Sequence, residues 1–188
     1  MKSTRLLALA AACLALSTAH AQTAEAAAHS GMYAEIGYAA PEFKTSDGID
    51  SMKASPSLVS GVFGYQLHPN FAVEGFLGLG AGKDGLKFNG LSVPVNVKLG
   101  TLYGVFARPS VAVSESVDLF ARIGWMSTEL KASGPGGSYA DRNSSLAYGV
   151  GANFNLSKTS YLQASWTSFY DKHETQIQGL GLAYGMRF

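Results

Sequence analysis

The C-terminal segment, residues 175–188, alternates strictly between bulky apolar side chains and small or polar ones. The even positions carry the apolar residues Leu180, Leu182, Tyr184, Met186 and Phe188, and the odd positions carry Gly179, Gly181, Ala183, Gly185 and Arg187. Because successive side chains of a β-strand point to opposite faces, the pattern predicts a strand with one apolar face and one glycine-rich face. In a soluble sandwich such a strand would be an exposed apolar edge. In a transmembrane barrel it forms a wall between lipid and a crowded interior.

Seven earlier segments show the same period of two, at about 31–40, 56–67, 71–80, 97–111, 117–129, 144–156 and 160–170. Short turns at 68–70, 114–116 and 157–159 alternate with long polar loops expected at 41–54, 81–95 and 131–143, and a short last loop is expected at 171–174. For 81–95 the alternative is that its second half extends the next strand. This alternation is typical of outer-membrane barrels, whose short turns lie in the periplasm. The sequence therefore predicts an all-β fold: an eight-stranded antiparallel transmembrane β-barrel over residues 31–188. We expect its last strand to pair with residues 31–40 and remove both edges.

The N-terminus has the features of a secretory signal peptide. A short basic start is followed by an apolar run from Leu6 to Leu16 and a small-residue cleavage site at Ala19-His-Ala21. We predict a signal peptide over 1–21 and a periplasmic lead over 22–30. The single cysteine, Cys13, lies inside the apolar run, and the leucine usual three residues before a lipidated cysteine is absent. The mature chain then has no cysteine, and lipidation of Cys13 is the less favoured alternative.

Composition supports a membrane wall rather than a soluble carrier. Hydrophobic residues make up 47% of the chain and charged residues only 14%, below the roughly 25% of an average soluble domain. The formal charge is +1, and removal of Lys2 and Arg5 with the signal peptide leaves −1 (+1 − 2), so nothing points to nucleic acid. A soluble periplasmic carrier barrel would need polar outer faces, whereas most predicted strands have apolar ones.

Several short segments resemble the eight-stranded outer-membrane barrel family, the OmpA-like and OmpX-like surface antigens among the small porin-family barrels. They are Gly64–Leu67, Phe71–Gly75, Leu119–Gly124, Tyr148–Gly151 and Ala183–Phe188. The resemblance implies a monomer in the cell outer membrane, in contact with lipid and lipopolysaccharide. It also implies that the barrel-assembly machinery recognises Phe188 together with Tyr184 and Met186. We expect deletion of Phe188 to lower membrane insertion.

Five charged residues fall on the glycine-bearing faces of the predicted strands: Glu35, Glu74, Lys98, Arg108 and Arg122. An eight-stranded barrel has an interior just wide enough to be filled by side chains, and an unpaired charge there is costly. On the lipid face at mid-membrane an Arg or Lys would instead cost roughly 2–4 kcal/mol. We expect these five residues to form a charge network inside the barrel that holds the wall together. A gated ion path is the alternative.

The sequence contains no motif that points to an enzymatic reaction. A lipid A or phospholipid hydrolase would need a histidine and a serine two residues apart on a strand, and none of His29, His68 and His173 has that spacing. No metal site and no cofactor are predicted. We therefore predict a non-enzymatic surface protein with a structural, envelope-integrity or adhesion role, whose loops at 43–54, 83–89 and 131–142 contact a host or envelope ligand. A small-solute or ion pore, the hydrolase and the soluble carrier remain as alternatives.

Overall fold

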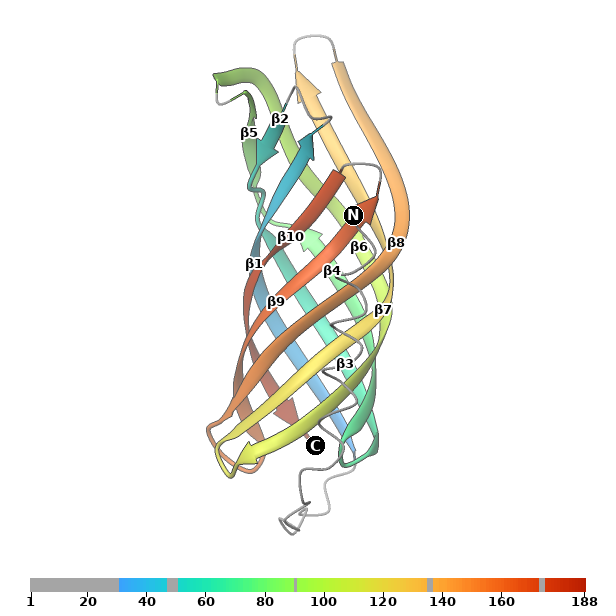
Figure 1. The fold of residues 1–188 in the computed structure, drawn as a ribbon, viewed down its shortest axis with the longest axis vertical. Coiled ribbons are helices and arrows are strands. Elements are labelled where there is room, and N and C mark those ends of the chain that lie inside the picture. The colour runs from blue at the N-terminus through green and yellow to red at the C-terminus, as the bar shows by residue number, and fades with distance from the viewer. Residues whose placement is uncertain (1–30, 47–50, 90, 135–136, 173–174) are drawn as a thin grey trace, which may run out of the picture.

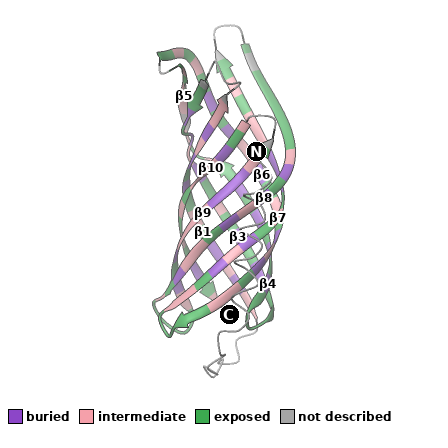
Figure 2. Cartoon of the chain, in the orientation of Figure 1, coloured by how far each residue is buried: buried purple, intermediate pink, exposed green. Residues whose placement is uncertain are grey.

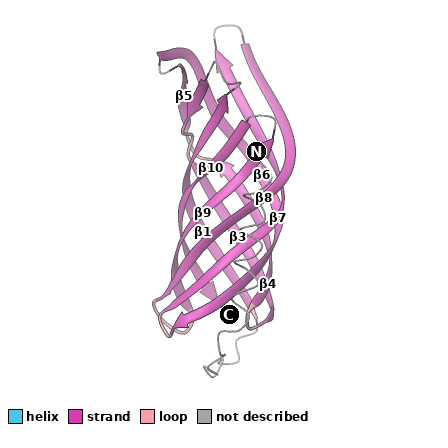
Figure 3. Cartoon of the chain, in the orientation of Figure 1, coloured by secondary structure: helices cyan, strands magenta, loops and turns pink. Residues whose placement is uncertain are grey.

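The computed structural model describes residues 31–46, 51–89, 91–134, 137–172 and 175–188, and every regular element in these ranges is a β-strand (Figures 1 and 3). The signal peptide predicted over 1–21 and the lead over 22–30 lie outside the described residues. Among those described, no helix is long and apolar enough to cross a membrane.

Eight strands form a closed ring in which each strand runs antiparallel to its neighbours. They are β1 (Met32–Ser46), β3 (Leu58–His68), β4 (Phe71–Gly80), β6 (Leu91–Ser114), β7 (Val117–Gly134), β8 (Gly137–Asn155), β9 (Ser160–Lys172) and β10 (Thr175–Arg187). The ring closes where β10 pairs with β1, from Tyr33 opposite Arg187 to Thr45 opposite Thr175. The predicted eight-stranded antiparallel barrel and its closure are confirmed.

The two ends of the barrel differ. The turns between β3 and β4, β6 and β7, and β8 and β9 are short and lie at the end that also holds the C-terminus (Figure 1). At the other end, two further strands, β2 (Ser51–Ala54) and β5 (Lys83–Phe88), pair with each other and join β1 to β6 beyond the ends of β3 and β4. We call this end, made of β2, β5 and the adjoining parts of β1, β6, β7 and β8, the extension.

The expectation of long loops at 41–54 and 131–143 is wrong for the described parts of these segments, and within 81–95 residues 83–88 form β5. The alternative expected for 81–95, that its second half extends the next strand, is confirmed. β1 continues to Ser46, β6 begins at Leu91, and β7 and β8 stay paired from Val117–Phe154 to Gly134–Gly137. The backbone groups of a polar segment are satisfied equally well by a strand ladder. Periodicity misses such strands because β2 and β5 are short and the outward faces of these segments carry charged residues in place of apolar ones.

Side chains alternate between the lumen and the outer wall along the strands (Figure 2). The exposed outer positions of the ring are mostly large and apolar, among them Ile36, Phe63, Leu77, Leu79, Val105, Ile123, Val150, Leu180 and Leu182. Aromatic residues lie at both ends of this apolar surface, with Tyr38 and Trp125 toward the extension and Tyr65, Phe154 and Phe188 toward the short turns. This is the surface that a bilayer with aromatic girdles at its two interfaces requires.

A β-bulge in β6 interrupts the alternation. The register with β7 shifts between Leu99 and Leu102, so that Gly100 and Thr101 together face Glu129. Leu99 and Leu102 are both fully buried although they are three positions apart, an odd offset that would place them on opposite faces of a regular strand. The Thr101 N–H donates to Glu129 Oε2 at 3.2 Å. Because a bulge adds one residue to one strand, it reverses the facing of every residue before it.

Candidate functional site

A layer of charged and polar side chains fills the lumen on the side of the short turns. Glu35 comes from β1, Glu74 from β4, Arg108 from β6 and Arg122 from β7, and all four are buried. Arg108 Nη1 donates to Glu35 Oε1 at 2.8 Å and to Glu74 Oε1 at 2.6 Å. Arg122 lies 3.7 Å from Glu35 Oε2 through Nη2 and 3.4 Å from Glu74 Oε2 through Nε. Two guanidinium groups therefore neutralise two carboxylates.

Neutral polar groups complete this layer. Tyr33 donates its hydroxyl hydrogen bond to Glu74 at 2.9 Å, and Tyr161 donates to Glu35 at 2.7 Å. Gln163 Nε2 also donates to Glu35 at 2.7 Å, and Asn153 Oδ1 accepts from Arg108 Nη2 at 3.1 Å. We call these eight residues the lumen network: Tyr33, Glu35, Glu74, Arg108, Arg122, Asn153, Tyr161 and Gln163. Buried charges of this kind are stable only when paired and hydrogen-bonded. Each of the four charged groups here is paired and makes at least one hydrogen bond, while Glu74 Oε2 and Arg122 Nε contact each other only as an ion pair.

The two strands that give the network no side chain give it space. Gly64 of β3 lies opposite Tyr33, and a Cβ there would come within 2.0 Å of the Tyr33 ring. Gly185 of β10 lies opposite Tyr161, and a Cβ there would come within 2.2 Å of that ring. Both tyrosines can therefore lie flat across a neighbouring strand and reach the carboxylates. All eight strands of the ring contribute either a polar group or this space.

Aromatic rings and a second, smaller ionic group flank the network. Arg108 lies over the Phe120 ring, with its Cζ 4.0 Å from the ring centroid, a favourable cation–π geometry. Nearer the short turns, Arg187 Nη2 contacts Asp118 Oδ2 at 3.2 Å and Asn155 Oδ1 at 2.9 Å. Arg187 also covers the Tyr161 ring at 4.5 Å. The last strand thus contributes an ion pair at this end of the lumen.

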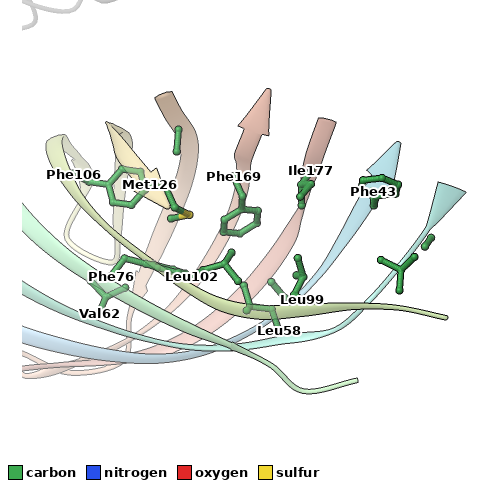
Figure 4. Close-up of a cluster of buried hydrophobic side chains, with 14 residues drawn as sticks. Phe43, Leu58, Val62, Phe76, Leu99, Leu102, Phe106, Met126, Phe169 and Ile177 are labelled. Carbon is green, nitrogen blue, oxygen red and sulfur yellow. The ribbon is translucent and has the colours of Figure 1, made fainter. Parts of the chain in front are cut away.

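An apolar layer fills the lumen on the side of the extension. Figure 4 shows part of it, with Phe76, Phe106, Met126 and Phe169 among the buried side chains. Phe76 contacts Phe106 at 6.2 Å and Phe169 at 6.1 Å between ring centroids. A cavity of about 30 Å³ lies next to Glu35, Arg122 and Gln163, enough for about one or two water molecules. Members of both layers line this cavity, among them Phe76 and Phe169 of the apolar layer.

The structure brings together four of the five charged residues predicted to meet in the lumen and excludes Lys98. Glu35, Glu74, Arg108 and Arg122 contact one another, whereas Lys98 is exposed on the outer face. The bulge at Gly100 and Thr101 is the reason, because it reverses the facing of Lys98 relative to Arg108. Sequence reasoning did not assign Tyr33 and Tyr161 to the network. Each of these two tyrosines lies opposite a glycine on a neighbouring strand. This pairing can be recognised only when the register of the strands is known.

The three residues predicted as an assembly signal lie on the outer face of β10. Tyr184, Met186 and Phe188 are all exposed, and the Phe188 ring lies 6.4 Å from that of Phe63 on β3. The Phe188 N–H donates to the Met32 carbonyl at 3.0 Å. Recognition of these residues by the barrel-assembly machinery stays a prediction.

Histidines and groups of possible metal ligands are the features that hydrolytic or metal chemistry would require. Among the described residues, no group of three or more His, Cys, Asp or Glu side chains could hold a metal ion. His68 is the last residue of β3, and its Nδ1 accepts from the Asn70 N–H in the following turn at 3.3 Å. His29 and His173 lie outside the described residues.

Comparison with known proteins agrees with this geometry. A family model described as "Outer membrane protein beta-barrel domain" matches residues 10–188. Among solved structures, the chain is similar to Ail, the attachment invasion locus protein of Yersinia pestis, with 26% identity and a TM-score of 0.61 over 84% of this chain and 99% of Ail. A second Ail structure, in complex with the heparin analogue sucrose octasulfate, matches at 24% identity with a TM-score of 0.57, over 84% and 97% of the two chains.

Neisserial surface protein A has the same fold, with 14% identity and a TM-score of 0.63 over 86% of this chain and all of that one. No curated protein matches the sequence. The chain belongs to the outer membrane protein beta-barrel domain family. It is therefore a transmembrane barrel of the cell outer membrane, and both the predicted resemblance and the predicted location are confirmed.

Proposed function

We propose that the protein is a non-enzymatic surface barrel with a closed lumen, and that it acts by binding anionic polymers through its extension. Family membership makes it an outer-membrane barrel, and short turns of such barrels face the periplasm. The extension is then extracellular. The observation that carries the proposal is a row of lysines that faces outward across this extension.

The row consists of Lys44 on β1, Lys53 on β2 and Lys87 on β5. Lys44 lies directly opposite Lys53, and Lys53 lies directly opposite Lys87. Like charges in directly opposed positions of an antiparallel pair destabilise it. Lys44 forms an ion pair with Glu42, with 2.8 Å between Nζ and Oε2. A ligand with closely spaced negative charges would remove the repulsion of Lys53 by Lys44 and by Lys87.

The Ail complex supports the choice of a sulfated ligand for the test. Sucrose octasulfate, a heparin analogue, is bound by Ail in that structure. For the present chain the argument rests on the lysine row, and the proposed ligand class is a sulfated or phosphorylated polysaccharide on a host or neighbouring surface. Adhesion or envelope contact would follow from such binding.

Binding of a heparin oligosaccharide to the barrel in lipid nanodiscs tests the proposal. We expect the triple variant Lys44→Gln, Lys53→Gln, Lys87→Gln to bind about tenfold more weakly, because three exposed charge contacts of about 0.5 kcal/mol each sum to about one decade. Lys158→Gln, in the turn between β8 and β9 at the opposite end, is the control and should bind normally. Equal affinity of wild type and triple variant would contradict the proposal.

Two further measurements distinguish the proposed binding protein from the two alternatives, a pore and a hydrolase. A lumen filled by the network and the apolar layer should give no discrete conductance in planar bilayers, and Arg122→Ala should open none because the apolar layer remains. Stepwise current through the wild type would favour the pore. A deletion strain with altered lipid A or phospholipid acylation would favour the hydrolase.

A further inference from the structure

We propose that a groove in the outer wall of the barrel binds a phosphorylated, multiply acylated lipid of the outer leaflet. Its acyl chains would lie in the groove, and its phosphate would bind the cations at the extracellular end of the groove. This inference depends on the location in the outer membrane and is independent of polysaccharide binding by the lysine row.

The groove has a volume of about 710 Å³ and crosses β3, β4, β6, β7 and β8. Its apolar walls are formed by exposed side chains of the lipid-facing surface: Phe63, Leu77, Tyr103, Val105 and Trp125. Small residues lie opposite large ones along its length. Gly61 faces Leu77, and Gly75 faces both Phe63 and Val105.

Two of the glycines that line the groove, Gly61 and Gly75, have no role in packing. A Cβ at Gly61 would find a single neighbour, a backbone oxygen at 3.9 Å, and the same holds at Gly75. Gly64 and Gly185, in contrast, accommodate tyrosine rings in the lumen. Gly61 and Gly75 therefore leave the outer wall hollow where larger side chains would fit without strain.

Cations surround the extracellular end of the groove. The Arg142 guanidinium lies 5.8 Å from the centroid of the Tyr103 ring, which lines the groove. Arg142 and Lys131 both approach Glu129 Oε2, at 3.7 and 3.5 Å, and both side chains are 51% exposed. The β6 bulge turns Lys98 to this same surface, directly opposite Lys131.

The charge of this cluster is not balanced by the described residues that it contacts. Arg142 and Lys131 pair with one carboxylate, Glu129, and Lys98 lies opposite Lys131, so these four side chains carry a local charge of +2 (3 − 1). The Thr101 N–H also occupies Glu129 Oε2. A phosphate would supply the missing negative charge and accept charge-assisted hydrogen bonds from Arg142 and Lys131.

The cluster lies at the height of a lipid headgroup. Arg142 is two residues beyond Ser144, which lines the groove, and a strand rises about 3.3 Å per residue, so its backbone is roughly 7 Å farther out. A cation on the lipid face costs little near the membrane interface. Acyl chains below and a phosphate above match the groove and its cations. A zwitterionic lipid would match the charge less well.

Quenching of Trp125 fluorescence tests the proposal, because this residue lines the groove. The chain has two tryptophans, and Trp166→Phe leaves Trp125 alone. The protein is placed in phosphatidylcholine vesicles that contain a few mole per cent of a lipid with brominated acyl chains, either a phosphorylated lipid A or phosphatidylcholine. We expect the phosphorylated lipid to quench Trp125 as strongly at about one tenth of the mole fraction, corresponding to one decade of affinity.

Two sets of variants test which residues cause the preference for the phosphorylated lipid. Gly75→Leu, alone and with Gly61→Leu, should abolish it by filling the groove, and Arg142→Gln with Lys131→Gln should weaken it severalfold. Lys53→Gln, in the lysine row, should leave it unchanged. Heat-dependent gel mobility verifies folding of each variant. Equal quenching by the two lipids would overturn the proposal, and so would a dimer in wild type that Gly75→Leu converts to monomer, because a second copy would then occupy the groove.

Discussion

Charged residues serve two different purposes at the two ends of this barrel. In the lumen network, two arginines and two glutamates are buried, neutral in sum, and hydrogen-bonded to tyrosine, asparagine and glutamine. In the extension, lysines are exposed and lie directly opposite other lysines, as in the row Lys44, Lys53 and Lys87. One group is balanced within the protein, and the other carries a surplus of positive charge.

The difference follows from the solvent around each group. Two charges attract or repel several times more strongly in a protein interior than in water, so a surplus charge in the lumen would be very costly. Water and salt screen the lysines of the extension, so their repulsion is a small cost. Neutral buried charge can therefore hold the wall closed, while exposed surplus charge is available to a ligand.

Removing one member of the lumen network should give the largest effect. Arg108→Leu leaves Glu35 and Glu74 buried with only Arg122 as a counter-charge. We expect the free energy of unfolding to fall by about 3–5 kcal/mol, the usual cost of leaving a buried charge uncompensated. Equilibrium urea unfolding in lipid vesicles, followed by tryptophan fluorescence, measures it.

The matched control removes charge of both signs. Arg108→Leu combined with Glu74→Leu restores neutrality, with Arg122 facing Glu35. This double variant should be more stable than Arg108→Leu alone, although it has lost more polar contacts. If the destabilising effects of the two substitutions simply added, the network would be a set of independent contacts. Charge neutrality would then not be what stabilises the lumen.

A smaller effect is expected where a glycine makes room for the network. Gly185→Ala places a Cβ within 2.2 Å of the Tyr161 ring, which must move away from Glu35. Overpacking of this kind costs typically 1–3 kcal/mol. The control is Gly61→Ala on the outer wall, where a Cβ meets only a backbone oxygen at 3.9 Å. The same unfolding experiment should show little change for it, and equal losses for both variants would rule out the role given to Gly185.

The sequence predicted most of the ring because lipid imposes a strict rule on its outer faces. A residue such as Leu180 or Leu182 must be apolar there, and its neighbours Gly179 and Gly181 must fit the lumen, so a period of two appears. The inward facing of Glu35, Glu74, Arg108 and Arg122 followed from the same rule. Family membership and location could be inferred from this wall.

Other features of the structure cannot be recognised from the alternation of apolar and polar residues in the sequence. The bulge at Gly100 and Thr101 shifts the register by one residue, and only the partner strand reveals that Lys98 faces outward. Tyr161 joins the network because β10 presents a glycine beside it, which depends on pairing between distant segments. In the extension the outward faces are charged, as at Lys44 and Lys53, and β2 and β5 span only four and six residues, so periodicity interprets them as loops although Phe43, Ala54 and Val97 are buried on the inner side. Contacts of these kinds are set by register rather than by local sequence.

The smallest expected effect, and one of opposite sign, concerns the lysine row. Lys53 lies between Lys44 and Lys87, so Lys53→Glu replaces two repulsions by two attractions. Cross-strand pairs contribute roughly 0.2–1 kcal/mol each, and we expect the amides of β2 and β5 to exchange with deuterium severalfold more slowly, while the amides of β9 do not change. High salt should slow exchange in the wild type and hasten it in the variant, because screening weakens repulsion and attraction alike. A wild-type row that is insensitive to salt would mean that its charges are already compensated, and the extension would then carry no surplus for a ligand.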